Sequence, residues 1–335
     1  MSPPPPSPLA RQLGLCTLMA GAAWGPLVAP VQAQPQVPDM ATLDYRLQPR
    51  QIAPGVWVIE GAVDDFDPKN GCNIINTGWI ATPDGITVVN TGPSKQYGEQ
   101  QRRAVERTSG QRVTQVLNLN LHPDYFFGNQ AWPDVPTRSL AGSRAGMQAE
   151  GAAYADNLYA LCGDWMKGTE STPARETLAA GEKRTGDRLE LMRLSGHTAD
   201  DLVLIDHSTG VVFAGGLVFA ERIPTTPHAD LDAWLGSLDR LESRLAGMAL
   251  AAVVPSHGPV YPDLRGLHQT RDYLRWLRQR LSDSAAQGLD ISEVLALPLP
   301  ARFAGWGAAR TEYARNVTHL YPRHERAALT AAGSR

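Results

Sequence analysis

The chain has 335 residues, of which 43% are hydrophobic, and a formal net charge of -3. This length can bury the core of one large domain or of two modest ones. The near-neutral charge gives no support for nucleic acid or an anionic membrane surface as a partner.

The first 33 residues have the features of an export signal. Arg11 supplies a positive charge, Leu13 to Val28 is mostly apolar, and Val31-Gln32-Ala33 carries the small residues that signal peptidase needs. A membrane anchor is the alternative, but the apolar run is short and is interrupted by glycine and proline. We therefore expect a signal peptide over residues 1–33, a mature protein in the periplasm, and no membrane span after cleavage.

The first half of the mature chain is rich in short β-like runs. A polar leader over residues 34–47 precedes them. The predicted strands, separated by turn residues, are Val56–Glu60, Asn73–Ala81, Gly85–Asn90 and Val113–Asn118. Tyr97–Arg107 has the composition of a polar helix, and Asp156–Lys167 has helix-like spacing of its large residues.

The second half repeats this order. Its predicted strands are Leu189–Leu194, Leu202–Asp206, Val211–Ala214 and Ala251–Pro255. Asp230 is placed to cap a helix whose leucine-rich stripe begins at Leu231, and a second amphipathic helix carries Leu267 to Leu281. Two β-rich halves, each closed by helices, predict an α/β fold, a four-layer αββα sandwich over residues 48–260. A helical extension over residues 261–335 would follow it.

Two cysteines remain once the signal is removed. Cys72 and Cys162 suit a disulfide in an oxidising periplasm. Two separately buried thiols explain the same sequence, and spacing does not choose between these alternatives.

Polar residues that can bind metals follow three of the predicted strands. His122 and Asp124 lie in the segment Asn120 to Tyr125, directly after one strand, while His197 and His257 follow two others. Alternate residues of an extended segment point the same way, and imidazole and carboxylate groups are ligands for divalent metals. We expect the four side chains to lie around one cleft at the strand ends.

The order and spacing of these segments resemble the metallo-β-lactamase superfamily over roughly residues 50–260. That family's pattern has an Asp-Thr-Gly turn, His-x-His-x-Asp-His, Gly-His-Thr, a strand ending Ala-Gly-Asp, and a late Ser-His-Gly. The flanking segments resemble its periplasmic branch, the quinoprotein relay system zinc metallohydrolases; they are His122–Trp132, Cys162–Met166 and Pro224–His228.

Carried onto this chain, the resemblance implies a depleted metal centre. The first metal position would hold Asn120, His122 and His197, and the second would hold Asp124, Tyr125 and His257. The Asp that bridges both ions is Gly216, and the Asp of the Asp-Thr-Gly turn is Asn90. We expect one Zn²⁺ at most, held by His122, Asp124, His197 and His257 in some combination, with a protein that binds no metal as the alternative.

The resemblance implies a periplasmic hydrolase whose activated water attacks an ester, thioester or lactone in a small-molecule substrate. Asp124 would orient the water, and Asn120 or Tyr125 would donate a hydrogen bond to the oxyanion. Alternatively, Asn120 holds a loop and Tyr125 is a packed aromatic. The competing function is a non-catalytic accessory or binding protein. In either case the family branch suggests a quinoprotein dehydrogenase, or its electron acceptor, as a partner.

Overall fold

The computed structural model describes residues 1–4, 37–178, 183–184 and 188–333. The chain divides into two units, Met1–Gln34 and Pro35–Arg335, and the second contains all the described secondary structure. Nearly all of the predicted signal peptide lies outside the described residues. Within the described ranges, no helix is both long enough and apolar enough to cross a bilayer.

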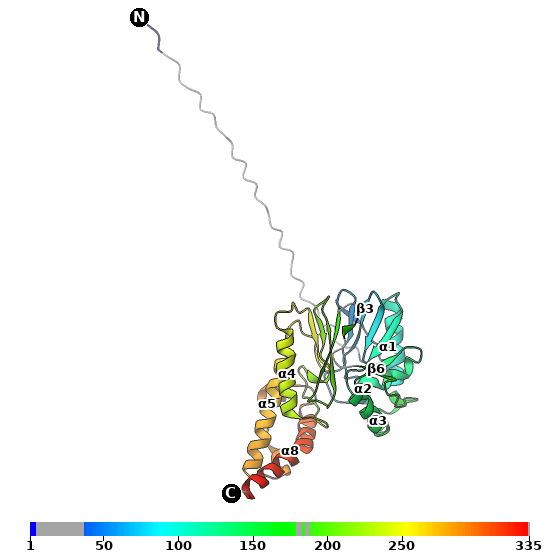
Figure 1. Cartoon of the computed structure of the whole chain (residues 1–335), viewed down its shortest axis with the longest axis vertical. Coiled ribbons are helices and arrows are strands. Elements are labelled where there is room, and N and C mark those ends of the chain that lie inside the picture. The colour runs from blue at the N-terminus through cyan, green and yellow to red at the C-terminus, as the bar shows by residue number, and fades with distance from the viewer. Residues whose placement is uncertain (5–36, 179–182, 185–187, 334–335) are drawn as a thin grey trace. The chain divides into compact units, whose positions relative to one another are not determined.

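Two β-sheets lie side by side at the centre of the second unit (Figure 1). The first sheet has seven strands in the order β1-β2-β3-β4-β5-β6-β7, and the second has five in the order β12-β11-β10-β9-β8. The strands are β1 (Arg50–Ala53), β2 (Val56–Ile59), β3 (Thr77–Thr82), β4 (Gly85–Val89), β5 (Val113–Leu117), β6 (Thr137–Ser139), β7 (Glu176–Thr177), β8 (Lys183–Arg184), β9 (Leu189–Leu194), β10 (Asp201–Asp206), β11 (Val211–Phe213) and β12 (Ala252–Val254).

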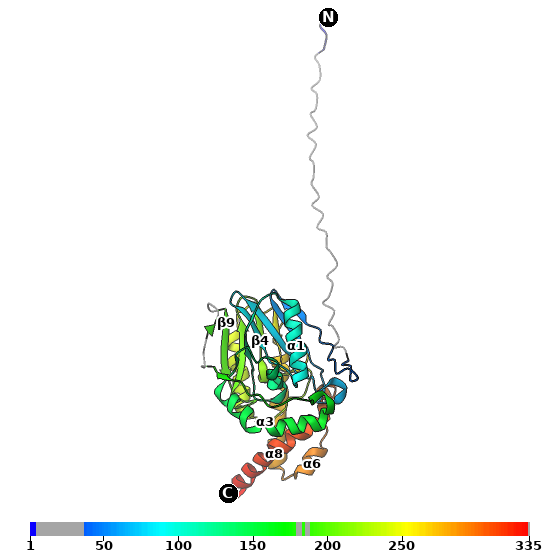
Figure 2. The ribbon, with the colours of Figure 1, turned by 90° about the vertical axis from the view of Figure 1, so that its right-hand side faces the viewer.

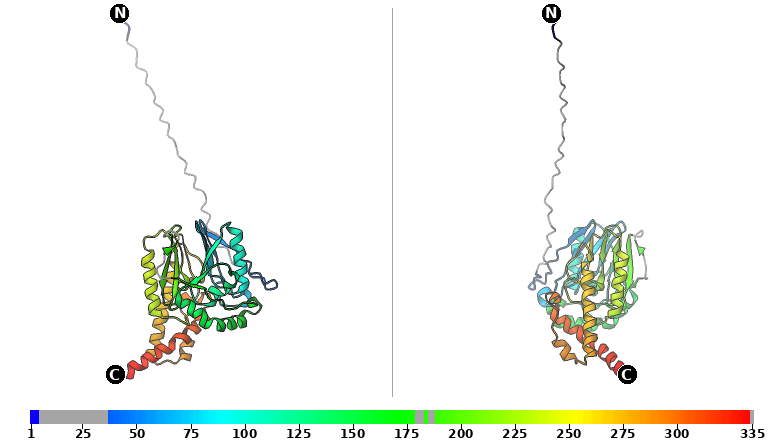
Figure 3. Two further views of the ribbon diagram at one scale, coloured as in Figure 1. Left: turned by 45° about the vertical axis from the view of Figure 1, so that its right-hand side comes forward. Right: turned by 90° about the vertical axis from the view of Figure 1, so that its left-hand side faces the viewer.

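Helices cover the outer face of each sheet (Figures 1 and 2). The α-helices are α1 (Lys95–Thr108), α2 (Pro123–Phe126), α3 (Ala141–Cys162), α4 (Leu231–Leu245), α5 (Arg265–Ala286), α6 (Ile291–Ala296), α7 (Ala301–Ala304) and α8 (Ala309–Gly333). In Figure 3, α4 and α5 flank one sheet while α1 flanks the other. This arrangement confirms the predicted αββα sandwich.

Strand β10 shows why the sandwich has four layers. All six of its residues are buried, and successive side chains of a strand point to opposite faces. Leu202 and Leu204 pack between the two sheets, whereas Val203 and Ile205 pack against the helices outside the second sheet. A strand that is buried on both faces has a continuous apolar sequence. In β10 this sequence is Leu202–Ile205.

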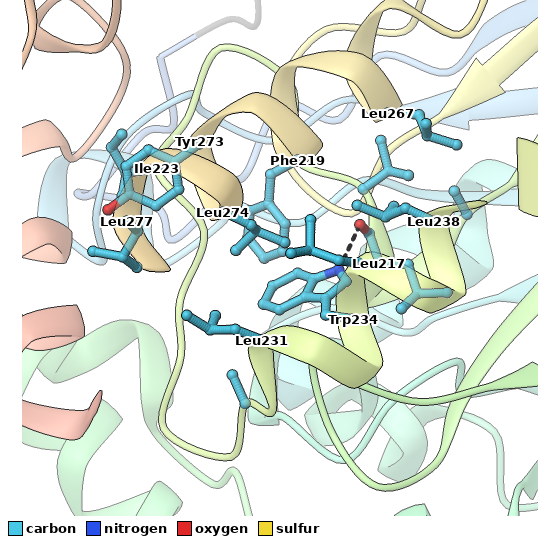
Figure 4. Packing of buried hydrophobic residues seen from close by; sticks show 14 of the residues in the cluster. Leu217, Phe219, Ile223, Leu231, Trp234, Leu238, Leu267, Tyr273, Leu274 and Leu277 are labelled. Carbon is cyan, nitrogen blue, oxygen red and sulfur yellow. Dashed lines mark hydrogen bonds between the residues drawn. The ribbon is translucent and has the colours of Figure 1, made fainter. Parts of the chain in front are cut away.

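The outer core of the second sheet is formed by α4, α5 and α8 (Figure 4). Asp230 caps α4 as predicted, because its side chain accepts a hydrogen bond of 2.9 Å from the backbone N–H of Ala233. Trp234 lies at the centre of the cluster, and its indole N–H donates to the carbonyl of Leu217 at 3.0 Å. That bond fixes α4 to the short turn η4 (Gly215–Leu217), which borders the candidate site.

Two predicted elements differ from the structure by more than two residues at one or both ends. The helix predicted over Asp156–Lys167 is α3, which begins fifteen residues earlier at Ala141 and ends at Cys162. Its first turns are rich in alanine and glycine and lack a continuous apolar stripe, so periodicity does not reveal them. The strand predicted over Asn73–Ala81 begins only at Thr77, so residues 73–76 lie outside it.

A disulfide joins Cys72 to Cys162, which decides between the two alternatives that the sequence left open. It connects the segment before Ile74 to the C-terminal end of α3. Both cysteines are buried beside Trp165, whose indole N–H donates to the carbonyl of Pro68 at 2.8 Å. The disulfide therefore ties two segments that reach the candidate site from opposite sides.

Candidate functional site

A pocket of about 210 Å³ lies beyond the C-terminal ends of β5 and β12. Three of the predicted residues, His122, Asp124 and His257, line it. The remaining lining residues are Phe66, Ile74, Pro123, Glu150, Tyr154, Asn157, Thr225, Pro227 and His228. The structure therefore brings three of the four predicted metal ligands to one pocket.

Asp124 and His257 face each other across the pocket floor. Nε2 of His257 lies 3.5 Å from Oδ2 of Asp124, and its Nδ1–H donates to the carbonyl of Ile74 at 2.7 Å. Burial raises the pKa of Asp124 to about 7 and lowers the pKa of His257 well below its ordinary value. Both groups are thus biased towards their neutral forms, as expected of ionisable groups removed from water.

His122 belongs to a hydrogen-bonded row that the sequence did not reveal. Its Nε2 lies 3.1 Å from Nδ1 of His228, and Nε2 of His228 lies 3.0 Å from the Glu150 carboxylate. Glu150 also accepts a 2.7 Å hydrogen bond from the hydroxyl of Tyr154. In the sequence, only its place in the segment Pro224–His228 draws attention to His228. Glu150 and Tyr154 carry no motif.

His197 is fully buried behind the pocket and packs against Gly216. A Cβ atom built at Gly216 would lie 2.7 Å from Cε1 and 3.0 Å from Cγ of His197, and closer still to Nδ1. The imidazole ring therefore fills the volume that a side chain at position 216 would need. It still meets His122 edge to face, with ring centroids 4.7 Å apart.

Asn120 is turned away from the pocket. Its amide nitrogen donates to Asp201 at 2.6 Å, and its amide oxygen accepts from the backbone N–H of His122 at 3.0 Å. Asp201 also accepts from the backbone N–H of Thr198 at 2.9 Å and of His197 at 3.1 Å. Asn120 therefore holds a buried loop network, and the structure does not bring its amide to the place of an oxyanion donor.

Tyr125 and Asn90 likewise have structural contacts. The Tyr125 ring packs in the core between the two sheets, and its hydroxyl is buried without a hydrogen-bond partner among the described residues. Burial raises the pKa of Tyr125 well above its ordinary value. Asn90 accepts a 3.0 Å hydrogen bond from the backbone N–H of Leu119. The role of oxyanion hydrogen-bond donor predicted for Tyr125 has no geometric support, because Tyr125 does not line the pocket.

The residues present do not fit the zinc centre that the sequence pattern implies. Each of the two metal positions keeps two strong ligands, since Asn120 and Tyr125 point elsewhere and position 216 has no side chain. Among the described residues, no group of three or more His, Cys, Asp or Glu side chains is arranged to hold a metal ion. A protein zinc site normally has at least three such ligands.

Helix α8 fixes two segments that form the pocket rim. The guanidinium of the buried Arg222 donates to Glu312 of α8 at 3.2 Å and to the carbonyl of Asp64 at 2.8 Å. Asn316, also on α8, donates to the carbonyl of Pro224 at 3.0 Å. The segments that carry Phe66 and His228 are thereby positioned by the C-terminal helix.

Comparison with solved structures places this fold among metallo-β-lactamases. The DIM-1 metallo-β-lactamase exposed to ceftazidime has a TM-score of 0.56 at 17% identity, covering 72% of this chain and 99% of its own. The metallo-β-lactamase from Pontibacter korlensis has a TM-score of 0.55 at 23% identity, covering 68% and 99%. FIM-1 from Pseudomonas aeruginosa, in a mono-zinc form, has a TM-score of 0.55 at 19% identity, covering 69% and 95%.

A search of curated proteins found no match. The family model described as the metallo-beta-lactamase superfamily matches residues 70–257, which is more than half of the chain. This range contains the pocket residues on α2 and α3 and the two loops that carry His197 and His257. The chain therefore belongs to the metallo-β-lactamase superfamily.

Proposed function

We propose that this protein is an exported small-molecule-binding protein that keeps the metallo-β-lactamase fold and its pocket without the family's zinc centre. The observation that carries this proposal is the packing of His197 into the space beside Gly216. Position 216 therefore has no carboxylate to bridge two ions, and each metal position keeps only two strong ligands. The pocket itself remains, with apolar walls and a few convergent polar groups, as binding sites usually have.

Export is supported by the signal-like residues 1–33 and by the disulfide, which suits an oxidising compartment. The resemblance of the segments His122–Trp132 and Pro224–His228 to the quinoprotein relay branch supports an accessory role. We propose a quinoprotein dehydrogenase, or its electron acceptor, as the partner in that role.

A hydrolase acting on an ester, thioester or lactone is the second candidate. It is favoured by the family and by Asp124 and His257, which remain together on the pocket floor. In this function the pair would hold the attacking water and take its proton, as general bases do. Replacement of Asp124 by Asn would then abolish hydrolysis.

Metal content is the decisive measurement for the proposal. The mature protein, purified from an oxidising compartment, is loaded with Zn²⁺, dialysed against metal-free buffer and submitted to elemental analysis. A zinc-binding member of the superfamily is treated in parallel as the positive control. We expect well under one zinc ion per chain, and one or more retained ions would overturn the proposal. Hydrolysis of an ester, thioester or lactone panel, lost in Asp124→Asn, would establish the second candidate instead.

A further inference from the structure

The pocket has a carboxylate on each of two walls. Asp124 projects from α2 and Glu150 from α3. The lining residues, all of which the structure describes, include no lysine or arginine. The nearby buried Arg222 does not line the pocket, and its guanidinium is bonded to Glu312 and to the carbonyls of Asp64 and Ile223.

The other polar groups of the pocket include imidazole rings. His122 and His257 are both buried and line the pocket. His228 lies between His122 and Glu150, in contact with both. The polar face of the pocket therefore presents carboxylate oxygens and ring nitrogens.

Glu150 is placed to receive a ligand from solvent. Its side chain is 37% exposed, whereas Asp124 is almost completely buried. It accepts from Tyr154 and contacts His228, which leaves further acceptor sites, since a carboxylate has about four lone-pair positions. The adjacent rings of Tyr154 and Phe66 supply aromatic surface of the kind that attracts organic cations.

We infer that the pocket binds a small organic amine as its ammonium ion, with the ammonium group at Glu150 and an apolar body against Phe66, Ile74 and Pro227. This inference rests on the proposed function and names the ligand class. The volume of about 210 Å³ lies below the usual range of pockets for drug-sized ligands, so the ligand is small. A carboxylate of the same size is repelled by the Glu150 carboxylate.

Three compounds of one shape and different charge test this inference. Benzylamine, benzyl alcohol and benzoate are titrated into the mature, disulfide-bonded protein by calorimetry at pH 8, where an ordinary histidine is neutral and an alkylamine is protonated. We expect benzylamine to bind tightest and benzoate weakest. Glu150→Gln, which keeps the shape and removes the charge, should weaken benzylamine about 10-fold and leave benzyl alcohol unchanged.

Asp156→Asn is the matched control, because Asp156 is an exposed carboxylate on the same helix outside the pocket. It should leave binding of all three compounds unchanged. The inference fails if benzoate binds as tightly as benzylamine, a result that leaves the small-molecule-binding function standing. Equal losses in the two variants would also overturn it, since surface charge would then explain the preference. Zinc retention tests the proposed function separately from all these outcomes.

Discussion

The imidazole of His197 occupies the space that any side chain at Gly216 would require. Position 216 is where the superfamily pattern has its bridging Asp, so in this structure a side chain there would require the His197 ring to shift. A metal site could be restored by adding Asp at position 216 and His at positions 120 and 125. These substitutions would also require the His197 ring to move from its present position.

Replacement of Gly216 by Ala should destabilise the protein by about 1–3 kcal/mol, because the new methyl group overlaps a fully buried ring. Urea unfolding measures the change. Gly236→Ala is the control, since nothing lies within 4 Å of a Cβ there and alanine favours a helix. The double variant Gly216→Ala with His197→Ala should lose less than the sum of the single variants. Strictly additive losses would show that the ring is not the obstacle.

The raised pKa of Asp124 predicts a pH-dependent cost to stability. The folded state has a pKa of about 7 and the unfolded state an ordinary value of 3.8, so the folded state binds more protons between these pH values. Stability therefore falls as pH rises through this window. Asp124→Asn removes the cost and should be more stable than the wild type at pH 8, by on the order of 3 kcal/mol, with no gain near pH 4.

Urea unfolding of both proteins from pH 4 to pH 8 checks this prediction. Asp156→Asn, which removes an exposed carboxylate, should show no such pH-dependent gain. A gain for Asp124→Asn that grows as pH falls would have the wrong sign and would contradict the buried, protonated state.

Removal of the Tyr125 hydroxyl should cost little. The group is buried without a hydrogen-bond partner among the described residues, so Tyr125→Phe deletes an unsatisfied polar atom and keeps the packed ring. We expect unchanged or slightly raised stability, within about 1 kcal/mol, in thermal unfolding. Ligand binding in the pocket should be unaffected. A large loss of binding or turnover would restore the functional role predicted from the sequence.

Loss of the disulfide should weaken both the fold and the pocket. The bond closes a loop with a sequence separation of 90, and removing a native disulfide typically costs about 2–5 kcal/mol. The variant with both Cys72 and Cys162 replaced by Ser should therefore melt at a lower temperature. It should also bind pocket ligands less tightly, because Ile74 and Glu150 lie on the two joined segments. Two free thiols in the denatured, non-reduced wild type would refute the premise.

The fold was predictable because its strands carry periodic patterns. Leu189–Leu194 is predicted and observed with identical bounds, and the sandwich follows from two strand-rich halves. Helix α3 was predicted only at its C-terminal end, since its alanine- and glycine-rich start has no apolar stripe. Tertiary packing, not local pattern, holds such a helix in place.

The sequence predicted which residues lie near the site, but not the directions in which their side chains point. His122, Asp124 and His257 do line one pocket, as their places after strands suggested. His197 packs against Gly216 because position 216 has no side chain. The two residues are not neighbours in the sequence, so no local sequence pattern predicts this contact. Glu150 lies on α3 and lines the pocket, but the residues of α3 that face the pocket form no recognisable sequence motif.

The anchoring of the pocket rim by α8 bears on how the protein should be produced for study. A recombinant chain that stops at residue 260 would strip Glu312 and Asn316 from their partners. The guanidinium of Arg222 would then lose its carboxylate partner. Phe66 and His228 would lose their support at the same time. Affinity tags are therefore better placed before the folded unit than fused to α8, and crystallisation or binding work requires a chain that keeps α8.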